Sequence, residues 1–291
     1  MLGQQKIVIS ASRRTDIPCY YMDWFMDRIQ QGFFEVVNPF SLTVSIVPAT
    51  PDMVGVIVFW SKNFAPFIFG DYGRRLIKKG FNLFFHFTIN SESPILEPRI
   101  PPLRERLKQL KILCNTFHPD LIIWRFDPIT FFQINHGPLQ SNLNDFERIA
   151  DAMADLGIRR CVTSFMDDYP KIRKRITKRP RFSFCYLPIN TKVRIITRME
   201  QQLAERDISL YACCESELLN ALPEGFHIKP SSCIPNDLFV KLFGCTLSLK
   251  KDTGQRIRRG CGCRTSKDIG SYYLHPCHNL CLYCYANPSS M

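Results

Sequence analysis

"KIVISASRRTDIP", residues 6–18, runs from a strand-like apolar segment into the polar cluster SRRTD. From there, strand-like and helix-like segments alternate as far as about residue 213. Runs rich in β-branched and aromatic residues mark the further strand candidates. They are FFEVVNPF (33–40), VGVIVFW (54–60), FNLFFHFTI (81–89), LIIWRFD (121–127), RRCVTSF (159–165), RFSFCYL (181–187) and ISLYAC (208–213).

Helical stretches with apolar residues near a 3.6-residue period lie between most of these runs. The three clearest are 100–117, opened by proline, 144–157, ended by Gly157, and 190–207. Alternating β and α elements predict a parallel sheet with helices outside it. With up to eight strands, we predict an α/β fold that forms a complete or partial (β/α) barrel of the TIM-barrel type. The connection after residue 40 is short and interrupted by proline, so we expect an irregular unit there.

Polar residues fall where the predicted strands end. After SRRTD (12–16), these ends are NPF (38–40), WSKN (60–63), HFTIN (86–90), WRFDP (124–128), SFMDD (164–168) and CCES (213–216). The carboxyl ends of barrel strands share one face, where active sites are built. We therefore predict a substrate pocket lined by Lys62, Asn63, His86, Trp124, Arg125 and Asp127. Any single strand end has ordinary loop polarity or helix capping as its alternative explanation, which we favour for Asp127-Pro128 or Asn38-Pro39 taken alone, and His86 has a semi-buried structural histidine as its alternative.

The regular alternation stops near residue 214. We therefore predict a barrel body over 1–213 and a Cys-rich C-terminal extension over 214–291 that packs across the barrel mouth. One capped helix is expected within 230–244. The rest of the extension has little to form a core, so it needs metal or docking onto the barrel to become ordered.

The composition, 45% hydrophobic and 22% charged, is that of an ordinary globular protein. The longest apolar run, 54–60, is far too short to cross a membrane, and the start lacks a signal-peptide layout. We expect a soluble cytoplasmic protein with no membrane partner.

The net charge is +12, and residues 171–181 carry seven basic residues and no acid. This run fits a solvated helix or an anion-binding face, and its lack of aromatic residues gives only weak support to nucleic-acid binding.

Thirteen cysteines are many for 291 residues. In a reducing cytosol, clustered thiols indicate metal ligands rather than disulfides. Cys277, Cys281 and Cys284 form a C-x3-C-x2-C pattern. Three thiolates on a four-iron cluster leave one iron free for an external ligand. The alternative is a zinc site in which His275 or His278 completes a Cys3His tetrahedron.

A second group of cysteines consists of Cys213, Cys233 and the pair Cys261 and Cys263 in GCGC. Four thiolates would close the coordination shell of an auxiliary iron–sulfur cluster. Cys214 could take the place of Cys213. The alternative is a set of separate buried thiols, with GCGC on a flexible loop.

The C-x3-C-x2-C pattern with an aromatic residue before its last cysteine resembles the signature of the radical S-adenosylmethionine (SAM) superfamily. The chain as a whole resembles an uncharacterised family, domain of unknown function 1848. The motifs that carry this second resemblance are ISASRRTDIP (9–18), VNPF (37–40), VFWSKN (58–63), WRFDPI (124–129), KKDTGQR (250–256), CGC (261–263), DIGSY (268–272) and CLYCYAN (281–287). Leu280 stands where such cluster motifs have glycine.

The resemblance implies a (β/α) barrel with a three-cysteine [4Fe–4S] cluster that binds SAM and, when reduced, cleaves it to start hydrogen abstraction from a substrate. Arg13, Arg14, Asp16 and Tyr283 are then the expected cofactor contacts, because an Arg fork matches the SAM carboxylate. For Arg14 and Asp16, a structural salt bridge is the alternative. We expect a small-molecule or anionic substrate and a reductant such as flavodoxin or ferredoxin. The alternative function is a non-catalytic iron–sulfur protein that senses redox state or binds nucleic acid.

Overall fold

A parallel sheet of eight strands forms the centre of the computed structural model, which describes residues 4–38, 41–256 and 259–287. The strand order is β12-β11-β9-β6-β5-β4-β1-β13, and every neighbouring pair is parallel. The strands are β1 (Ile7–Ala11), β4 (Val54–Ser61), β5 (Leu83–Thr88), β6 (Ile122–Ile129), β9 (Arg160–Phe165), β11 (Ser209–Ala212), β12 (Lys229–Pro230) and β13 (Lys267–Asp268). The chain therefore has a mixed α/β fold.

Two predicted strands lie outside this sheet. The run 33–40 gives β2 (Phe33–Val37), which pairs antiparallel with β3 (Val44–Pro48). The run 181–187 gives β10 (Phe182–Phe184), which pairs antiparallel with β7 (Phe131–Ile134), itself paired with β8 (Gln140–Ser141). Their assignment to the parallel sheet was wrong. The short link from β2 to β3 permits a hairpin, whereas a parallel crossover needs about a dozen residues or more.

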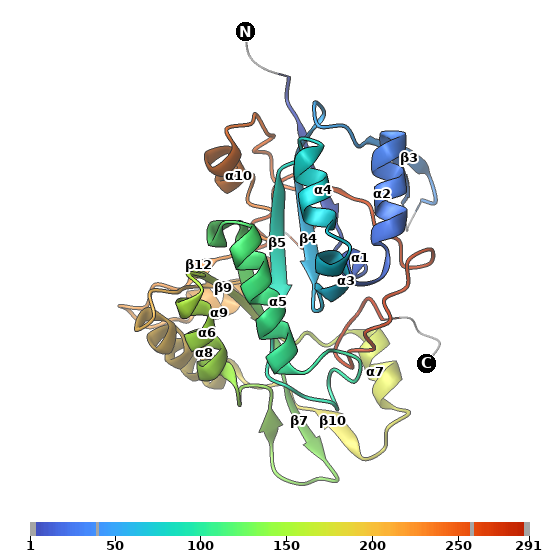
Figure 1. Ribbon diagram of the computed structural model, residues 1–291. Coiled ribbons are helices and arrows are strands. Elements are labelled where there is room, and N and C mark those ends of the chain that lie inside the picture. The colour runs from blue at the N-terminus through green and yellow to red at the C-terminus, as the bar shows by residue number, and fades with distance from the viewer. Residues whose placement is uncertain (1–3, 39–40, 257–258, 288–291) are drawn as a thin grey trace.

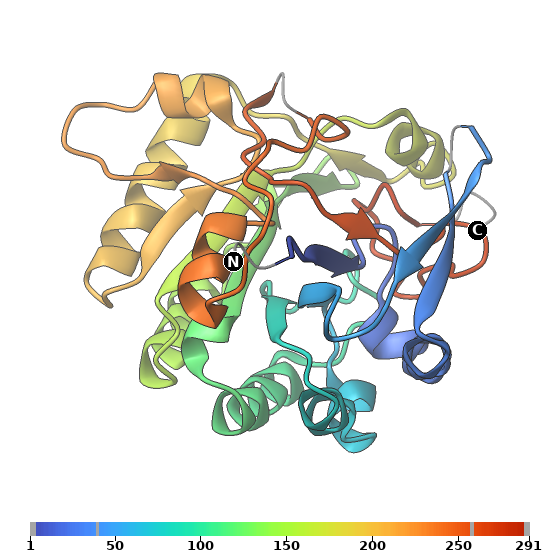
Figure 2. The same cartoon turned by 90° about the horizontal axis from the view of Figure 1, so that it is seen from above.

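The sheet is open in the part of the chain that the structure describes, because its edge strands β12 and β13 do not pair with each other. The described strands thus do not close into a complete barrel. Both edge strands come from the segment after residue 213, which is consequently built into the sheet at each side. Figure 2 shows the sheet bent into an arc, with the orange-to-red tail along its concave side.

Helices cover the outer, convex face of the sheet (Figure 1). They are α2 (Met22–Gln31), α3 (Ala65–Phe69), α4 (Tyr72–Lys78), α5 (Leu103–Thr116), α6 (Phe146–Asp155) and α8 (Ile189–Ala204). The helices predicted over 100–117, 144–157 and 190–207 are confirmed as α5, α6 and α8. Their apolar faces join outward strand residues such as Phe59 and Phe126 in one large core. Within the described ranges, no helix is both long and apolar enough to cross a membrane.

The inner face of the sheet is covered by helix α10 (Asn236–Phe243) and the Cys-rich tail. Alternate strand residues point to this face, so Val58 and Phe84 join a second core while Phe59 and Phe85 belong to the first. Phe239 of α10 packs edge-on against Phe84 with ring centroids 4.8 Å apart. The helix predicted within 230–244 begins only at residue 236, because residue 230 belongs to β12 and the segment 231–235 that follows is irregular.

Phe239 is fully buried, so we predict that Phe239→Ala lowers the free energy of unfolding by about 3–5 kcal/mol through the cavity that it leaves. Phe69, which is 86% exposed, is the matched control, and Phe69→Ala should stay within about 0.5 kcal/mol of wild type. Urea unfolding measures both. Equal losses for the two variants would show that α10 is not anchored through this ring.

Candidate functional site

The loop that carries Cys277, Cys281 and Cys284 lies at the carboxyl ends of β1, β4 and β5. Asn279 donates from Nδ2 to Asp16 Oδ2 just after β1, at 2.9 Å. The Leu282 N–H donates to the carbonyl of Leu96, in the segment after β5, at 2.9 Å. Figure 1 shows this red segment beside helix α7 (Pro170–Ile176). The three thiols therefore face the end of the sheet where the predicted polar residues gather.

The three thiols are held in a partly closed setting. Cys281 is buried, and Cys277 and Cys284 are half-buried. Burial raises the pKa of each of these thiols. The N–H groups of Ala286 and Asn287 donate to the sulfur of Cys284, which partly offsets that rise. Such N–H donors stabilise a thiolate, the form that binds metal.

A buried polar network joins this loop to the sheet. Tyr283 donates its hydroxyl to Glu97 Oε1, and Lys62 Nζ lies 2.8 Å from the same oxygen. Asn90 Nδ2 donates to the Tyr283 hydroxyl at 3.0 Å. Burial alone would raise the pKa of the Glu97 carboxyl, but the charges of Lys62 and Arg106 outweigh burial and lower it. Glu97 therefore stays ionised beside the thiols.

The structure thus brings together two predicted residues, Lys62 and Tyr283, with two that the sequence analysis did not single out, Asn90 and Glu97. Asn90 is the last residue of the quoted strand end HFTIN, so its position was a usable signal. Glu97 lies seven residues further on, in an irregular segment where no pattern marked it. Its second oxygen, Oε2, is buried and has no hydrogen-bond partner among the described residues.

Arg13, Arg14 and Asp16 make structural contacts at the end of β1. The Arg13 guanidinium lies 3.7 Å from Asp268 and 3.6 Å from Asp252. Arg14 donates to the carbonyl of Gly270 at 3.2 Å. Asp16 accepts from the N–H groups of Cys19 and Lys62 and from Asn279. Their polar atoms are therefore largely engaged within the chain, although Arg13 NH1 is buried without a partner among the described residues.

A second polar group lies on the inner face of the sheet, built from the predicted residues His86, Arg125 and Asp127. The His86 ring stacks on Trp60 with centroids 4.0 Å apart, and its Nε2–H donates to the carbonyl of Cys233 at 2.8 Å. Arg125 NH2 lies 2.5 Å from Asp127 Oδ2. Burial, followed by the charge of Arg125, lowers the pKa of His86 to about 3, which keeps the ring neutral.

Asn63 and Trp124 do not join these two groups. Asn63 Oδ1 accepts a hydrogen bond from Gln109 Nε2 at 3.0 Å, so its side chain is held by helix α5 rather than by either polar group. Trp124 lies on the outer face, where its ring stacks on Phe146 of α6. The cause is the two-residue repeat of a strand: because Arg125 and Asp127 point inward, Trp124 must point outward. Of the strand end NPF (38–40), Pro39 and Phe40 lie outside the described residues.

The second group of cysteines meets on the inner face of the sheet. The sulfurs of Cys213 and Cys233 are 3.4 Å apart, and Cys214 lies 3.8 Å from Cys213. Cys263 is hydrogen-bonded to Cys233 and to Cys261. Hydrogen bonds from the Cys213 and Cys263 thiols, reinforced by Arg125, lower the pKa of Cys233 well below the usual thiol range. We refer to Cys213, Cys214, Cys233, Cys261 and Cys263 as the interior thiol group.

His275 and His278, the zinc ligands of the alternative interpretation, contact aromatic residues. The His275 ring lies 4.1 Å from that of Trp24, centroid to centroid, and His278 Nε2 lies 3.3 Å from the Tyr21 hydroxyl. Among the described residues, no three His, Cys, Asp or Glu side chains are grouped as they would be around a bound metal ion. The protein as described therefore has thiol groups, but no preformed ligand shell.

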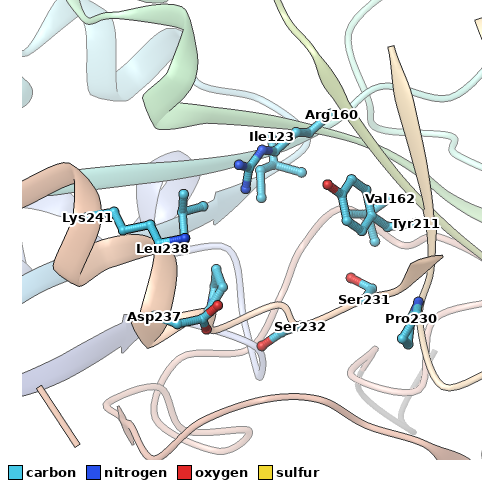
Figure 3. A pocket seen from close by; sticks show the side chains of 11 residues that line it. Ile123, Arg160, Val162, Tyr211, Pro230, Ser231, Ser232, Asp237, Leu238 and Lys241 are labelled. Atoms are coloured by element: carbon cyan, nitrogen blue, oxygen red, sulfur yellow. The ribbon is translucent and has the colours of Figure 1, made fainter. Parts of the chain in front are cut away.

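A cavity of about 280 Å³ opens at the opposite, amino end of the sheet. Figure 3 shows it between α10 and strands β6, β9 and β11. Arg160 and Tyr211 direct their polar ends into it, and Ser231 lies at its wall with a buried hydroxyl that has no partner among the described residues. None of the predicted pocket residues lines this cavity.

The basic run 171–181 forms α7 and the turn after it. Arg175 points inward and donates to the carbonyls of Leu282 and Cys284 at 2.6 and 3.1 Å. The remaining basic residues of the run are exposed: Lys171, Arg173, Lys174, Lys178, Arg179 and Arg181. One cation of this run therefore holds the cysteine loop, and the others face solvent.

Asp16 is buried, and burial raises its pKa to about 6 even though several groups donate hydrogen bonds to it. The folded protein therefore binds this proton more tightly than the unfolded chain does. We predict that its stability falls, relative to that of Asp16→Asn, by up to about 3 kcal/mol as the pH rises from about 4 to about 6. Urea unfolding of both proteins across this range measures the difference. Parallel stability curves would contradict the prediction.

Comparison with known proteins places these features in one family. No curated protein matches the chain. A family model described as Domain of unknown function (DUF1848) matches residues 8–286. The match covers every strand of the parallel sheet except the first residue of β1, as well as both thiol groups. The chain therefore belongs to the DUF1848 family.

Proposed function

We propose that this chain is a radical SAM-type enzyme in which Cys277, Cys281 and Cys284 hold a [4Fe–4S] cluster. The observation that carries the proposal is the position of the three thiols at the carboxyl ends of β1, β4 and β5, beside a buried carboxylate and ammonium. Active sites of parallel α/β proteins form at this end of the strands. The arc of parallel strands is also compatible with the partial (β/α) barrel that the motif resemblance implies.

The residues around the loop fit a cluster bound by three thiolates. Lys62 and Arg175 lie close enough to lower the pKa of the Cys284 thiol by their charge, and positive charge stabilises thiolates. The three thiols are not hydrogen-bonded to one another in the described part of the chain, whereas those of the interior thiol group are. Thiols that do not pair with one another are compatible with thiolates that each bind a different iron. His275 and His278 are held by aromatic rings, which favours leaving the fourth iron open.

A reduced three-thiolate cluster would supply the electron that cleaves SAM. The chain's own contribution is to shape the space around it. Glu97, whose Oε2 has no partner among the described residues, is a hydrogen-bond acceptor for an amino group, and Tyr283 fixes its direction. Leu280 has φ +55°, a region that favours glycine, so the loop keeps its turn despite the leucine. On the inner face, His86 and Arg125 are buried and already held by Trp60, Asp127 and Cys233, so we assign them to the support of the site rather than to substrate contact.

We predict that Cys281→Ala abolishes the release of 5′-deoxyadenosine from SAM by the anaerobically reconstituted and reduced protein, because one cluster ligand is lost. Cys185→Ala is the matched control, because Cys185 is a half-buried thiol that directly follows β10. This variant should retain full activity. Liquid chromatography of the nucleoside product measures the reaction, with flavodoxin or dithionite as reductant.

The same preparations test the alternative of a non-catalytic iron–sulfur protein. That protein would bind iron and sulfide through the same triad but would neither bind nor cleave SAM. SAM cleavage that persists in Cys281→Ala, or a wild-type protein that contains zinc without sulfide, would overturn the proposal.

A further inference from the structure

The interior thiol group is a cluster of reactive side chains that the proposed triad chemistry does not use. Its members come from three distant parts of the chain: the end of β11, the segment before α10, and the GCGC loop. Cys213, Cys233 and Cys263 are at most 6% exposed. Thiols with no role beyond packing are usually dispersed through a core. These thiols instead form a chain of hydrogen bonds from Cys213 through Cys233 and Cys263 to Cys261.

Backbone geometry brings the GCGC loop close to the other thiols. A Cβ atom on Gly262 would lie 3.0 Å from the carbonyl oxygen of Ser231 and 3.4 Å from Ser232 Cβ. Only glycine permits so close an approach without a shift of the neighbouring chain. The approach places Cys261 and Cys263 against the segment that carries Cys233.

Fixed positive charge faces the sulfurs. Arg125 is 7% exposed and donates from NH1 to Cys233 Sγ at 3.1 Å. An arginine cannot lose its proton inside a protein, so the buried guanidinium requires negative charge nearby. Asp127 supplies one such charge. A metal centre with four thiolates carries net negative charge and would supply more.

We propose that Cys213, Cys233, Cys261 and Cys263 form a closed four-thiolate site for a single thiophilic ion, zinc or iron. Thiolates 2.3 Å from one tetrahedral ion stand about 3.8 Å apart, close to the 3.4 Å between Cys213 and Cys233. A cubane would place each thiolate on a separate iron and spread the sulfurs more widely. Because the described residues form no preformed ligand shell, binding would require the thiol side chains to rearrange around the ion.

The cavity at the amino end of the sheet borders the core that contains this site. Its wall includes Ile123 and Val162, which belong to the same inner core as Cys213 and Cys233. Ser232, also in the wall, directly precedes Cys233. An ion bound by the four cysteines would link the tail to β11 and so fasten the tail to the inner face of the sheet. This role does not depend on any reaction at the triad.

The test removes the triad first. A chain with Cys277, Cys281 and Cys284 all changed to Ala, purified anaerobically, should retain about one zinc or iron ion per chain without inorganic sulfide. Elemental analysis distinguishes the two metals. Adding Cys233→Ser should lower the metal content about tenfold, whereas adding Cys114→Ser, at a half-buried thiol on α5, should leave it unchanged.

A second measurement covers the case in which the triad-free chain does not fold. Cobalt(II) added to the full metal-free chain should give the absorption of tetrahedral thiolate sites, of which the share that belongs to the interior thiol group should be lost in Cys233→Ser and kept in Cys114→Ser. A folded triad-free chain without metal, metal accompanied by equimolar sulfide, or a cobalt spectrum that Cys233→Ser leaves intact would each overturn the proposal. Loss of SAM cleavage alone would affect only the proposed enzymatic function.

Discussion

The carboxylate of Asp268 fixes the Cys-rich tail to the first strand of the sheet. It accepts hydrogen bonds from the hydroxyls of Ser10 and Ser12 at 3.0 and 2.7 Å and from the N–H of Arg13 at 2.8 Å. Gly270 follows so closely that a Cβ atom there would clash with Ser12 Oγ. Asp268 lies between the GCGC loop and the triad loop, so this attachment fixes the stretch of tail that joins them.

The packing of the tail against the sheet explains why the tail has an ordered structure without a large core of its own. The segment after residue 213 completes the sheet at both edges, through β12 and β13, and covers its inner face with α10. Its apolar residues are therefore buried against the strands that precede it in sequence. A division into body and extension describes the sequence pattern, whereas in the folded protein the two parts share one sheet.

Much of the sheet could be predicted because buried parallel strands read as short apolar runs, and six of the eight predicted runs pair as expected. The runs that became β2 and β10 have the same composition, and only their pairing partners separate them from the rest: β2 pairs with β3 across a short link, whereas β10 pairs with the distant β7. The strands β12 and β13 are two residues long and carry no apolar pattern, so no local signal could have revealed them.

The candidate site was predictable to the extent that strand ends converge. Lys62 and Tyr283 meet because one follows β4 and the other lies on the loop that crosses its end. Trp124 was misplaced because adjacent residues of a strand face opposite ways, a rule that the quoted stretch WRFDP already contained. Glu97 depends on the course of an irregular segment, which only tertiary structure determines.

Arg175 holds the triad loop entirely through main-chain oxygens, those of Leu282, Cys284 and Asn287. A grip of this kind does not depend on which side chains the loop carries. Evolution can therefore exchange the residues between the cysteines while the loop keeps its path, as long as a planar fork of donors remains at position 175.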